Sequence, residues 1–439
     1  MTGIEVGLIS VIAILILIYA GMYVPVALGL VSFVTVWLLR GSFEAPVYLV
    51  TLAASNSLED YIFGVIPLFV LMGLLVSHSQ MGRDIYQVAN HLLHKVSGGL
   101  GVATVVANAA FAAITGVSIA SASVFARVAV PEMMRFGYNP RFAVGVVAGS
   151  SVLGMLIPPS VMLIIYAIIT EQSVAALFTA GIIPGLMLAA AYIVAIVVMA
   201  KFFPRYVRGK QTDAAQTETE SRLTKSELFS KSAPLVILIL LVLGGIYGGV
   251  FTPTEAGAVG ALGALIIALV KRKLDRATLW KVLAETGHIV ASILMLIVAA
   301  TMYSRMLAIS GLPNELGELI NQTDIGLYGI LTIYVLLLIV LGTILDTTSI
   351  ILIMVPLFLP IMAPFNIDLV WFGIITIVGA EIGLLTPPLG ISCYVIKSTL
   401  NDDRISLYDI FAGAFPFAVI MLLVLIILII FPQLSLILV

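Results

Sequence analysis

Apolar runs of the length that crosses a bilayer alternate with short polar segments along almost the whole chain. A membrane-spanning helix needs about 20 mostly apolar residues. In the first half we expect uninterrupted spans at residues 4–20, 24–39, 61–77 and 173–200. The mixed segment 44–60 and the amphipathic segment 81–96 predict helices that lie along the membrane surface.

Two further apolar runs in each half contain residues that break helices. Residues 98–130 are interrupted at 115–118, which leaves about 15 residues on each side, too few for a full span. This pattern predicts a re-entrant hairpin. Residues 140–170 contain the pair Pro158-Pro159, and proline removes an N–H donor and clashes with the preceding helical turn. This run predicts a broken helix.

The second half contains the same two features. We expect a hairpin at residues 326–362 and a broken helix at 368–398, which carries Pro387-Pro388. Freed backbone groups cannot face lipid, so such breaks must face protein or a water-filled cavity. Two broken helices in matching positions indicate a transporter binding site, and the alternative is a pair of purely structural kinks. Gly149, Ser150, Ser151 and Gly154 accompany the first proline pair in the stretch 149–160, and we expect glycines and hydroxyls around the break to let the backbone open and to offer oxygens.

The two halves repeat each other at a nearly constant offset. Tyr19, Gly21, Pro25 and Gly29 match Tyr247, Gly249, Pro253 and Gly257 with an offset of 228 (247 − 19). Gly154 matches Gly383, and the proline pairs match each other, with an offset of 229 (383 − 154). This regularity predicts a first repeat at residues 1–205 and a second at 226–439, joined by a polar linker at 206–225.

Charge indicates that the repeats are inverted relative to each other. Residues 78–141 contain five basic side chains, at Arg83, Lys95, Arg127, Arg135 and Arg141, whereas the equivalent residues 306–370 contain none. Because Lys and Arg concentrate in cytoplasmic segments, we expect the first hairpin to enter from the cytoplasm and the second from outside. Five crossings per half then place the linker in the cytoplasm and both termini outside. Arg40 and Arg305 are exceptions to this rule.

Composition restricts the class of protein. Of 439 residues, 61% are hydrophobic and 10% charged, and the mean hydropathy is +1.19, which indicates a multi-span membrane protein. A net charge of −2 argues against nucleic-acid binding. The single cysteine, Cys393, excludes an intramolecular disulfide and a cysteine-based metal site. The first apolar run follows no basic segment, so we expect it to be retained as a span.

Hydroxyls, glycines and two acids cluster at the predicted hairpin tips and helix breaks. Neutral carbonyl and hydroxyl oxygens suit sodium, while the N-terminus of an opened half-helix suits an anion. The candidate positions for sodium and substrate in the first half are Thr115, Gly116, Ser118, Ser150, Ser151, Gly154 and Pro158. Those in the second half are Asp346, Thr347, Thr348, Gly379, Glu381, Gly383, Thr386 and Pro387.

The acids have alternative interpretations. An acid inside the membrane costs roughly 2.5–3.5 kcal/mol on insertion scales, so Asp346 and Glu381 are expected to face a cation or a cavity. Asp346 is also a favourable helix N-cap, and Glu255 reads as a helix-start residue. The offset of 229 pairs Asp346 with Val117, so the second tip offers a formal charge that the first lacks.

The sequence offers little support for an enzymatic or an ATP-driven function. Of the four histidines, His78, His91 and His94 lie on or beside the surface segment 81–96, and no nucleophile-and-base arrangement is evident within the membrane. The sequence contains neither a Walker A phosphate loop nor an HExxH zinc motif, so we expect no organic cofactor and no metal other than sodium.

The chain resembles the large membrane subunit of tripartite ATP-independent periplasmic (TRAP) transporters. The resemblance rests on four segments in family order: TGVSIASASVFARVAVPEMMRFGYNP, SVLGMLIPPSVMLIIY, GTILDTTSIILIMVPLFLPI and IGLLTPPLGISCYV. It implies a sodium-coupled secondary transporter of the ion-transporter superfamily, with a scaffold and an elevator domain, in the bacterial inner membrane. It also implies a periplasmic substrate-binding protein, a small four-helix membrane subunit on a separate polypeptide, and an organic acid as substrate, such as a C4-dicarboxylate or sialic acid.

The resemblance carries the family's hairpin and broken-helix positions onto this chain, at Thr115, Gly116, Ser118, Ser150, Gly154, Pro158, Pro159, Asp346, Thr347, Gly379, Gly383, Thr386, Pro387 and Pro388. Val117 departs from the family, which often has a second small hydroxyl residue in this tip. One alternative is a self-sufficient sodium–dicarboxylate or citrate symporter with similar inverted hairpins. An intramembrane enzyme is the more remote alternative.

Overall fold

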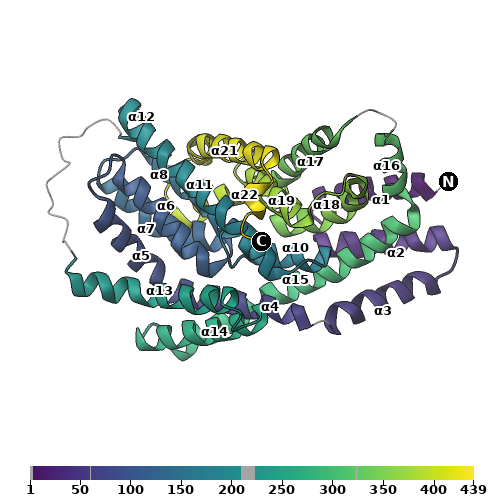
Figure 1. The fold of residues 1–439 in the computed structure, drawn as a ribbon, viewed down its shortest axis with the longest axis horizontal. Coiled ribbons are helices and arrows are strands. Elements are labelled where there is room, and N and C mark those ends of the chain that lie inside the picture. Colours follow the sequence, from purple (N-terminus) through teal and green to yellow (C-terminus); the bar gives the residue numbers. More distant parts are fainter. Residues whose placement is uncertain (1–2, 60, 209–222, 322–324) are drawn as a thin grey trace.

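The computed structural model describes residues 3–59, 61–208, 223–321 and 325–439, which form a bundle of helices (Figure 1). Within these ranges the chain forms no strand, and an isolated β-bridge joins Tyr138 to Arg208. The prediction of an all-helical membrane protein is confirmed. Seven described helices are long and apolar enough to cross a membrane, and an eighth span is formed if the pair Pro140–Leu156 and Val161–Thr170, bent by 41°, is counted as one.

The helices of the first half follow the apolar runs. They are α1 (Gly3–Tyr19), α2 (Val24–Arg40), α3 (Glu44–Glu59), η1 (Tyr61–Gly64), α4 (Val65–His78), α5 (Met81–Leu93), α6 (Gly99–Thr115), α7 (Ser118–Arg135), α8 (Pro140–Ser151), α9 (Leu153–Leu156), α10 (Val161–Thr170), α11 (Val174–Phe202) and α12 (Pro204–Val207).

The second half contains a closely similar series. Its helices are α13 (Lys225–Tyr247), α14 (Pro253–Val270), α15 (Arg276–Ser310), α16 (Leu312–Asn321), α17 (Leu327–Gly342), α18 (Thr347–Met362), η2 (Ala363–Phe365), α19 (Leu369–Leu384), α20 (Ile391–Leu400), α21 (Leu407–Ile430) and α22 (Gln433–Leu436).

Local sequence signals explain where several of these helices begin. Thr252 and Glu255 form a capping box at the start of α14, in which each side chain accepts a hydrogen bond from the other residue's N–H group. Pro253 occupies the first turn, where its missing N–H has no cost. Glu255 is therefore a helix-start residue, as predicted.

The order of helices in the two halves corresponds element by element. Helices α1 and α2 correspond to α13 and α14, the hairpin α6–α7 to α17–α18, the broken helix α8–α10 to α19–α20, and α11 to α21. The segment that contains α3, η1 and α4 corresponds to the single 35-residue helix α15. This correspondence supports the predicted duplication, and the inverted orientation of the halves stays a prediction.

Contacts between the halves are reciprocal. Helix α4 packs against α14, and its counterpart α15 packs against α2, the counterpart of α14. Likewise, α7 packs against α20 while α18 packs against α10, and α8 packs against α21 while α19 packs against α11. Reciprocal contacts of this kind arise when two similar units are related by a two-fold axis. The halves are thus interleaved.

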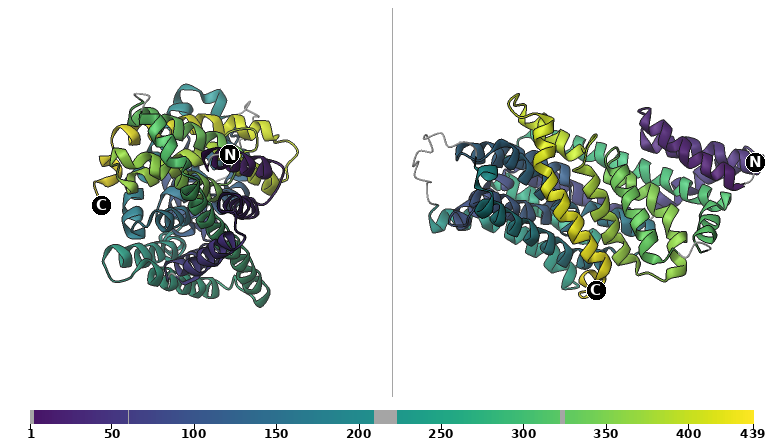
Figure 2. Two further views of the ribbon diagram at one scale, coloured as in Figure 1. Left: turned by 90° about the vertical axis from the view of Figure 1, so that its right-hand side faces the viewer. Right: turned by 90° about the horizontal axis from the view of Figure 1, so that it is seen from above.

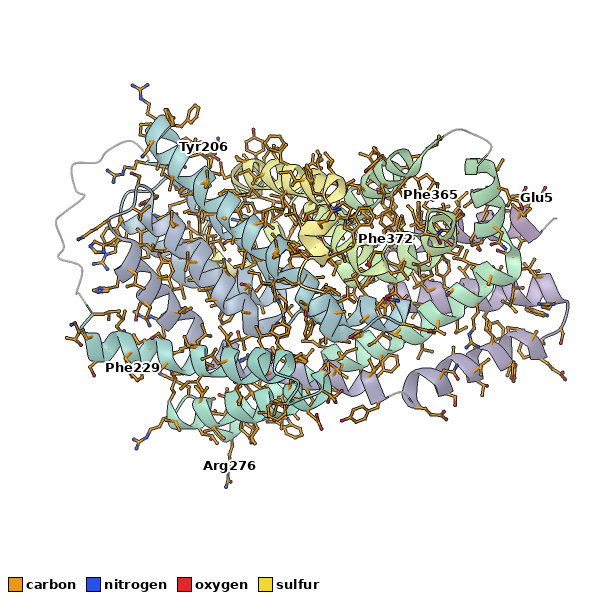
Figure 3. The ribbon with its side chains drawn as sticks, in the orientation of Figure 1. Glu5, Tyr206, Phe229, Arg276, Phe365 and Phe372 are labelled. Carbon is orange, nitrogen blue, oxygen red and sulfur yellow. The ribbon has the colours of Figure 1, made fainter. Side chains whose placement is uncertain are left out.

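The helices divide into two groups in space. Helices α2, α3, α4, α13, α14 and α15 lie along one side of the molecule, and α6–α8, α11, α17–α19 and α21 lie along the other (Figures 1 and 2). Phe372 of α19 lies in the interior and is fully buried, whereas Phe229 of α13 projects outward and is 73% exposed (Figure 3). Exposed apolar side chains of this kind are expected on helices that face lipid.

The orientation of the chain can be tested by cysteine labelling, because the sole native cysteine, Cys393, is buried. Most of the predicted linker 206–225 lies outside the described residues, so Ser226 at the start of α13 and Asn314 in α16, both exposed, are the better probes. We expect a membrane-impermeant maleimide to label Asn314→Cys in intact spheroplasts and to label Ser226→Cys only after permeabilisation. Labelling of Ser226→Cys in intact spheroplasts would overturn the inverted arrangement.

Candidate functional site

The first hairpin tip is a two-residue turn that contacts the break in the following helix. Gly116 and Val117 connect α6 to α7, and Gly116 has a positive φ of 60°. A Cβ atom at Gly116 would lie 2.6 Å from the Pro159 carbonyl oxygen, so this close approach requires glycine. The Gly116 carbonyl accepts a hydrogen bond from the Val161 N–H group at 3.3 Å. The tip is thereby held on the loop between α9 and α10.

The second tip is held in the same way by different residues. Residues 343–346 connect α17 to α18, and the Thr343 carbonyl accepts hydrogen bonds from the N–H groups of Leu389 at 3.1 Å and Gly390 at 3.3 Å. Both donors belong to the loop between α19 and α20. Each loop contains a cis peptide bond, Pro158–Pro159 in the first half and Pro387–Pro388 in the second. In both halves, hairpin tip and helix break form one structural unit.

The first helix break is narrower than the stretch 149–160. Helix α8 continues through Ser151, Val152 keeps right-handed helical dihedrals, and the backbone leaves the helix only at Ile157–Ser160. Gly149, Ser150 and Ser151 therefore lie within regular helix, and the open backbone is confined to the residues around the proline pair. Gly149 instead permits close packing, because a Cβ atom there would lie 2.5 Å from the Phe417 ring. Ser151 donates to the Ala148 carbonyl within the same helix at 2.8 Å.

Among the first-half candidates, Thr115, Gly116, Ser118 and Gly154 lie together at the tip. A Cβ atom at Gly154 would lie 3.3 Å from the Val117 carbonyl carbon, so the broken helix and the hairpin backbone are in close contact. The Thr115 hydroxyl donates back to the Phe111 carbonyl at 3.1 Å. The Ser118 hydroxyl is completely buried and has no hydrogen-bond partner among the described residues. Ser118 thus has the hydroxyl most available to a ligand.

A buried polar network behind the first tip includes a residue that sequence reasoning missed. Ser121 donates to Asn108 Oδ1 at 2.5 Å, and Asn108 Nδ2 donates to Ser150 Oγ at 2.5 Å. Ser150 in turn donates to the Val146 carbonyl at 2.7 Å. All three side chains are completely buried, and they join α6, α7 and α8. Ser150 therefore fixes the hairpin to the broken helix, and no sequence motif marks Asn108 as its partner.

At the second tip, the buried acid is Glu381. Its side chain is 1% exposed, and its Oε1 accepts a hydrogen bond from the Thr347 hydroxyl at 2.6 Å. Its Oε2 has no partner among the described residues. The hydroxyl of Tyr192, on α11, is also buried without a hydrogen-bond partner there. Glu381 and Thr347 thus link α19 to the start of α18 and leave one carboxyl oxygen available.

Asp346 occupies the N-cap of α18. Its carboxylate accepts hydrogen bonds from the Ser349 N–H group at 3.2 Å and from the Ser349 hydroxyl at 2.5 Å. Val117 takes the equivalent position in the first half and offers no side-chain cap. These contacts agree with the interpretation of Asp346 as a helix N-cap. Each of its carboxylate oxygens already accepts one hydrogen bond.

The remaining second-half candidates shape the site. Gly379 and Gly383 allow α19 to approach α17, since a Cβ atom at Gly383 would lie 2.6 Å from the Ile339 carbonyl oxygen. Thr348 contacts Met162 Sδ at 3.5 Å, which joins the second hairpin to the first broken helix. Thr386 donates to the Ile382 carbonyl at 2.5 Å, and Pro158 and Pro387 lie in the open loops.

Two cavities lie beside the hairpin helices. One of about 660 Å³ reaches the first tip at Thr115 and Val117 and is also lined by Arg127 and Lys281. The other, of about 490 Å³, is lined by the end of α10, by α18 and by Arg305 of α15. Both lie between the two groups of helices, because α4 or α15 contributes to one wall and a hairpin helix to the other. These cavities could not be predicted from the sequence, because their walls come from segments that are far apart in the chain.

Comparison with known proteins gives the family. A model of the tripartite ATP-independent periplasmic transporter DctM component matches residues 11–434. The chain is 31% identical to the C4-dicarboxylate TRAP transporter large permease protein DctM of Rhodobacter capsulatus, covering 96% of each chain. It is 33% identical to the corresponding protein of Pseudomonas aeruginosa over 86% of each chain, and 31% identical to the sialic acid TRAP transporter large permease protein SiaM of Vibrio cholerae over 87% of each.

Solved structures with a similar fold are more distant in sequence. The YdaH transporter of Alcanivorax borkumensis matches with a TM-score of 0.61 and 15% identity, over 89% of this chain and 90% of that one. MtrF of Neisseria gonorrhoeae matches with a TM-score of 0.58 and 13% identity, over 88% and 84% respectively. The family's named members are transporter permeases, so the chain is a transport protein and not an enzyme. It belongs to the DctM component family of tripartite ATP-independent periplasmic transporters.

Proposed function

We propose that this chain carries out secondary active, sodium-coupled uptake of an organic acid across the bacterial inner membrane. A periplasmic binding protein delivers the substrate, and a small four-helix membrane subunit completes the complex. The moving element is the block of hairpins and broken helices, α6–α11 and α17–α21. The remaining long helices, α1–α4 and α13–α15, form the scaffold.

The observation that carries the proposal is the attachment of each hairpin tip to the loop of the broken helix in the same half. Hydrogen bonds from Val161 to Gly116, and from Leu389 and Gly390 to Thr343, place two such units in one molecule. Broken helices expose backbone carbonyls and helix N-termini, which bind cations and anions respectively. The buried Ser118 hydroxyl and the available oxygen of Glu381 add the neutral and charged oxygens that sodium favours.

Two further observations support the substrate class and the elevator movement. The relatives are named as transporters of C4-dicarboxylate, sialic acid and 2,3-diketo-L-gulonate, all of which carry carboxylates. Two cavities lie between the proposed scaffold and the proposed moving block, one beside each hairpin. A rigid block that shifts along this boundary would open one cavity while closing the other.

Uptake in proteoliposomes tests the proposal. The chain is reconstituted with its small subunit, and binding protein is added outside with labelled succinate, sialic acid or 2,3-diketo-L-gulonate. We expect an inward sodium gradient to drive uptake of one carboxylate, and uptake to fall to background when choline replaces sodium. We also expect the chain alone, supplied with sodium and free acid, to be nearly inactive, because nothing in it resembles a capture domain.

The outcomes separate the alternatives. Full-rate uptake by the chain alone would favour the self-sufficient symporter and exclude a requirement for a binding protein. Uptake that is unchanged in choline would contradict sodium coupling. Failure of all three probes in the complete complex, together with no sodium-dependent change in the fluorescence of a Val117→Trp variant, would contradict both the substrate class and the ion site.

A further inference from the structure

The larger cavity runs from the first hairpin tip towards the linker side of the molecule. Its walls come from α4, α7, α15 and α20. Thr115 and Val117 line it at the tip. Arg127 follows Ser118 by nine residues on α7, so it lies about 14 Å further along that helix at 1.5 Å per residue. Lys281 lies in the second turn of α15, next to the basic segment 271–276. By the positive-inside rule this end faces the cytoplasm.

The two cations at this end have no partners of their own. Among the described residues, neither Arg127 nor Lys281 makes a hydrogen bond or an ion pair, whereas Arg141 is paired with Asp409, Lys271 with Asp84 and Arg404 with Asp402. Unpaired cations beside a partly apolar cavity concentrate anions there.

The rest of the lining does not cancel this charge. Glu285, one turn after Lys281, is the one carboxylate among the described lining residues, so two permanent cations face one acid. His78 Nδ1 is occupied by the Leu74 carbonyl at 3.0 Å. The hydroxyls of Ser77 and Ser123 add neutral hydrogen-bonding groups. The lining therefore has the composition of a weak carboxylate site.

We propose that Arg127 and Lys281 form an exit site that binds the carboxylate of the transported acid after it leaves the first hairpin tip. The inference rests on the proposed function and adds the residues that set affinity on the cytoplasmic side. An exit site of this kind raises the affinity of the inward-facing state for internal acid. It leaves the affinity for loaded binding protein outside unchanged, because that protein meets the opposite face.

Trans-inhibition measures the two affinities separately. Proteoliposomes of the complete complex are loaded with increasing unlabelled acid, using the probe that the wild type transports, and initial uptake of labelled acid is measured with binding protein outside. Arg127 and Lys281 are both exposed, and an exposed charge pair contributes roughly 0.2–1 kcal/mol, so Arg127→Gln is expected to raise the half-inhibiting internal concentration by about two- to fivefold. Lys281→Gln acts in the same direction, and Arg127→Lys retains most of the wild-type value.

Lys273→Gln is the matched control, since Lys273 is exposed in the same basic region and does not line the cavity. It should change neither affinity. An unchanged half-inhibiting concentration in Arg127→Gln, with normal uptake, would overturn the exit site while leaving the proposed function intact. A parallel rise in the external half-saturating concentration would also overturn it.

A lipid headgroup carries similar anionic chemistry and is distinguished by the composition of the vesicle. The measurements are repeated in phosphatidylcholine alone and with added phosphatidylglycerol. An effect of Arg127→Gln that persists in phosphatidylcholine supports the carboxylate. An effect seen only with phosphatidylglycerol assigns the two cations to lipid and contradicts the exit site.

Discussion

Replacing Glu381 by glutamine is expected to raise the sodium concentration for half-maximal uptake by at least about tenfold. The Glu381 side chain is 1% exposed, and Oε2 has no partner among the described residues, so a bound cation would be its counter-ion. Removing one member of a buried charged pair costs about 3–5 kcal/mol, and each 1.4 kcal/mol changes affinity about tenfold. Glutamine keeps the shape and still accepts the hydrogen bond from Thr347. The measurement is uptake against sodium concentration in proteoliposomes of the complete complex.

Asp346→Asn is the comparison for this prediction. The carboxylate of Asp346 accepts two hydrogen bonds from Ser349, and asparagine is an equally good N-cap, so this variant removes a charge without removing the cap. We expect a smaller shift than for Glu381→Gln, and a thermal-stability measurement in detergent confirms that both variants fold. A large shift in Asp346→Asn with an unchanged sodium curve in Glu381→Gln would reverse the assignment and return the charged site to Asp346.

Gly145→Ala is expected to lower the apparent Tm of the purified protein in detergent by about 1–3 °C. Gly145 of α8 and Gly413 of α21 face each other, and a Cβ atom at Gly145 would overlap the Gly413 carbonyl group. In turn, a Cβ atom at Gly413 would overlap the Arg141 carbonyl group. Both obstacles are backbone, so the helices must separate along their contact, and small residues are what permits such close approach in membrane proteins.

Gly29→Ala provides the control for the glycine prediction. Gly29 also lies within a helix, α2, but a Cβ atom there would meet nothing within 4 Å. Alanine favours a helix over glycine by about 1 kcal/mol, so this variant should be neutral or slightly more stable. If both substitutions lowered the Tm equally, the general loss of glycine flexibility would explain the result and the contact between α8 and α21 would not.

The sequence sufficed to predict the elements whose signals are local. Proline pairs, capping residues and the length of apolar runs act on their own segment, and they correctly indicated the turn at Gly116, the break before Ser160 and the start of α14 at Thr252. Repetition of these signals at a constant offset indicated two related halves. The all-helical, multi-span architecture followed from composition and run length.

What the sequence could not indicate depends on contacts between segments. Asn108 is a single polar residue in an apolar run, and its partners Ser121 and Ser150 become its neighbours only when α6, α7 and α8 pack together. Thr347 and Glu381 are 34 residues apart and meet across two helices. Glycine and serine can serve either an open backbone or close packing, and only the position of Phe417 decides between them at Gly149.

The two tips also differ in a way that the duplication alone would not predict. Behind the first tip, neutral groups of Asn108, Ser121 and Ser150 satisfy one another. At the second tip, by contrast, one carboxyl oxygen has no hydrogen-bond partner among the described residues. The two halves therefore carry unequal polar chemistry beside their hairpin tips.

The reciprocal packing of α4 on α14 and of α15 on α2 bears on how the protein is made. The ribosome completes α4 at His78, and Pro253, the first residue of its partner α14, follows 175 residues later (253 − 78). At 5–20 residues per second this interval is roughly 9–35 s. During that time α2 and α4 are already synthesised but lack their final neighbours, so lipid or another protein must cover their contact faces. Biogenesis therefore includes an interval in which α2 and α4 have been made but lack the contacts with α15 and α14 that they make in the finished protein.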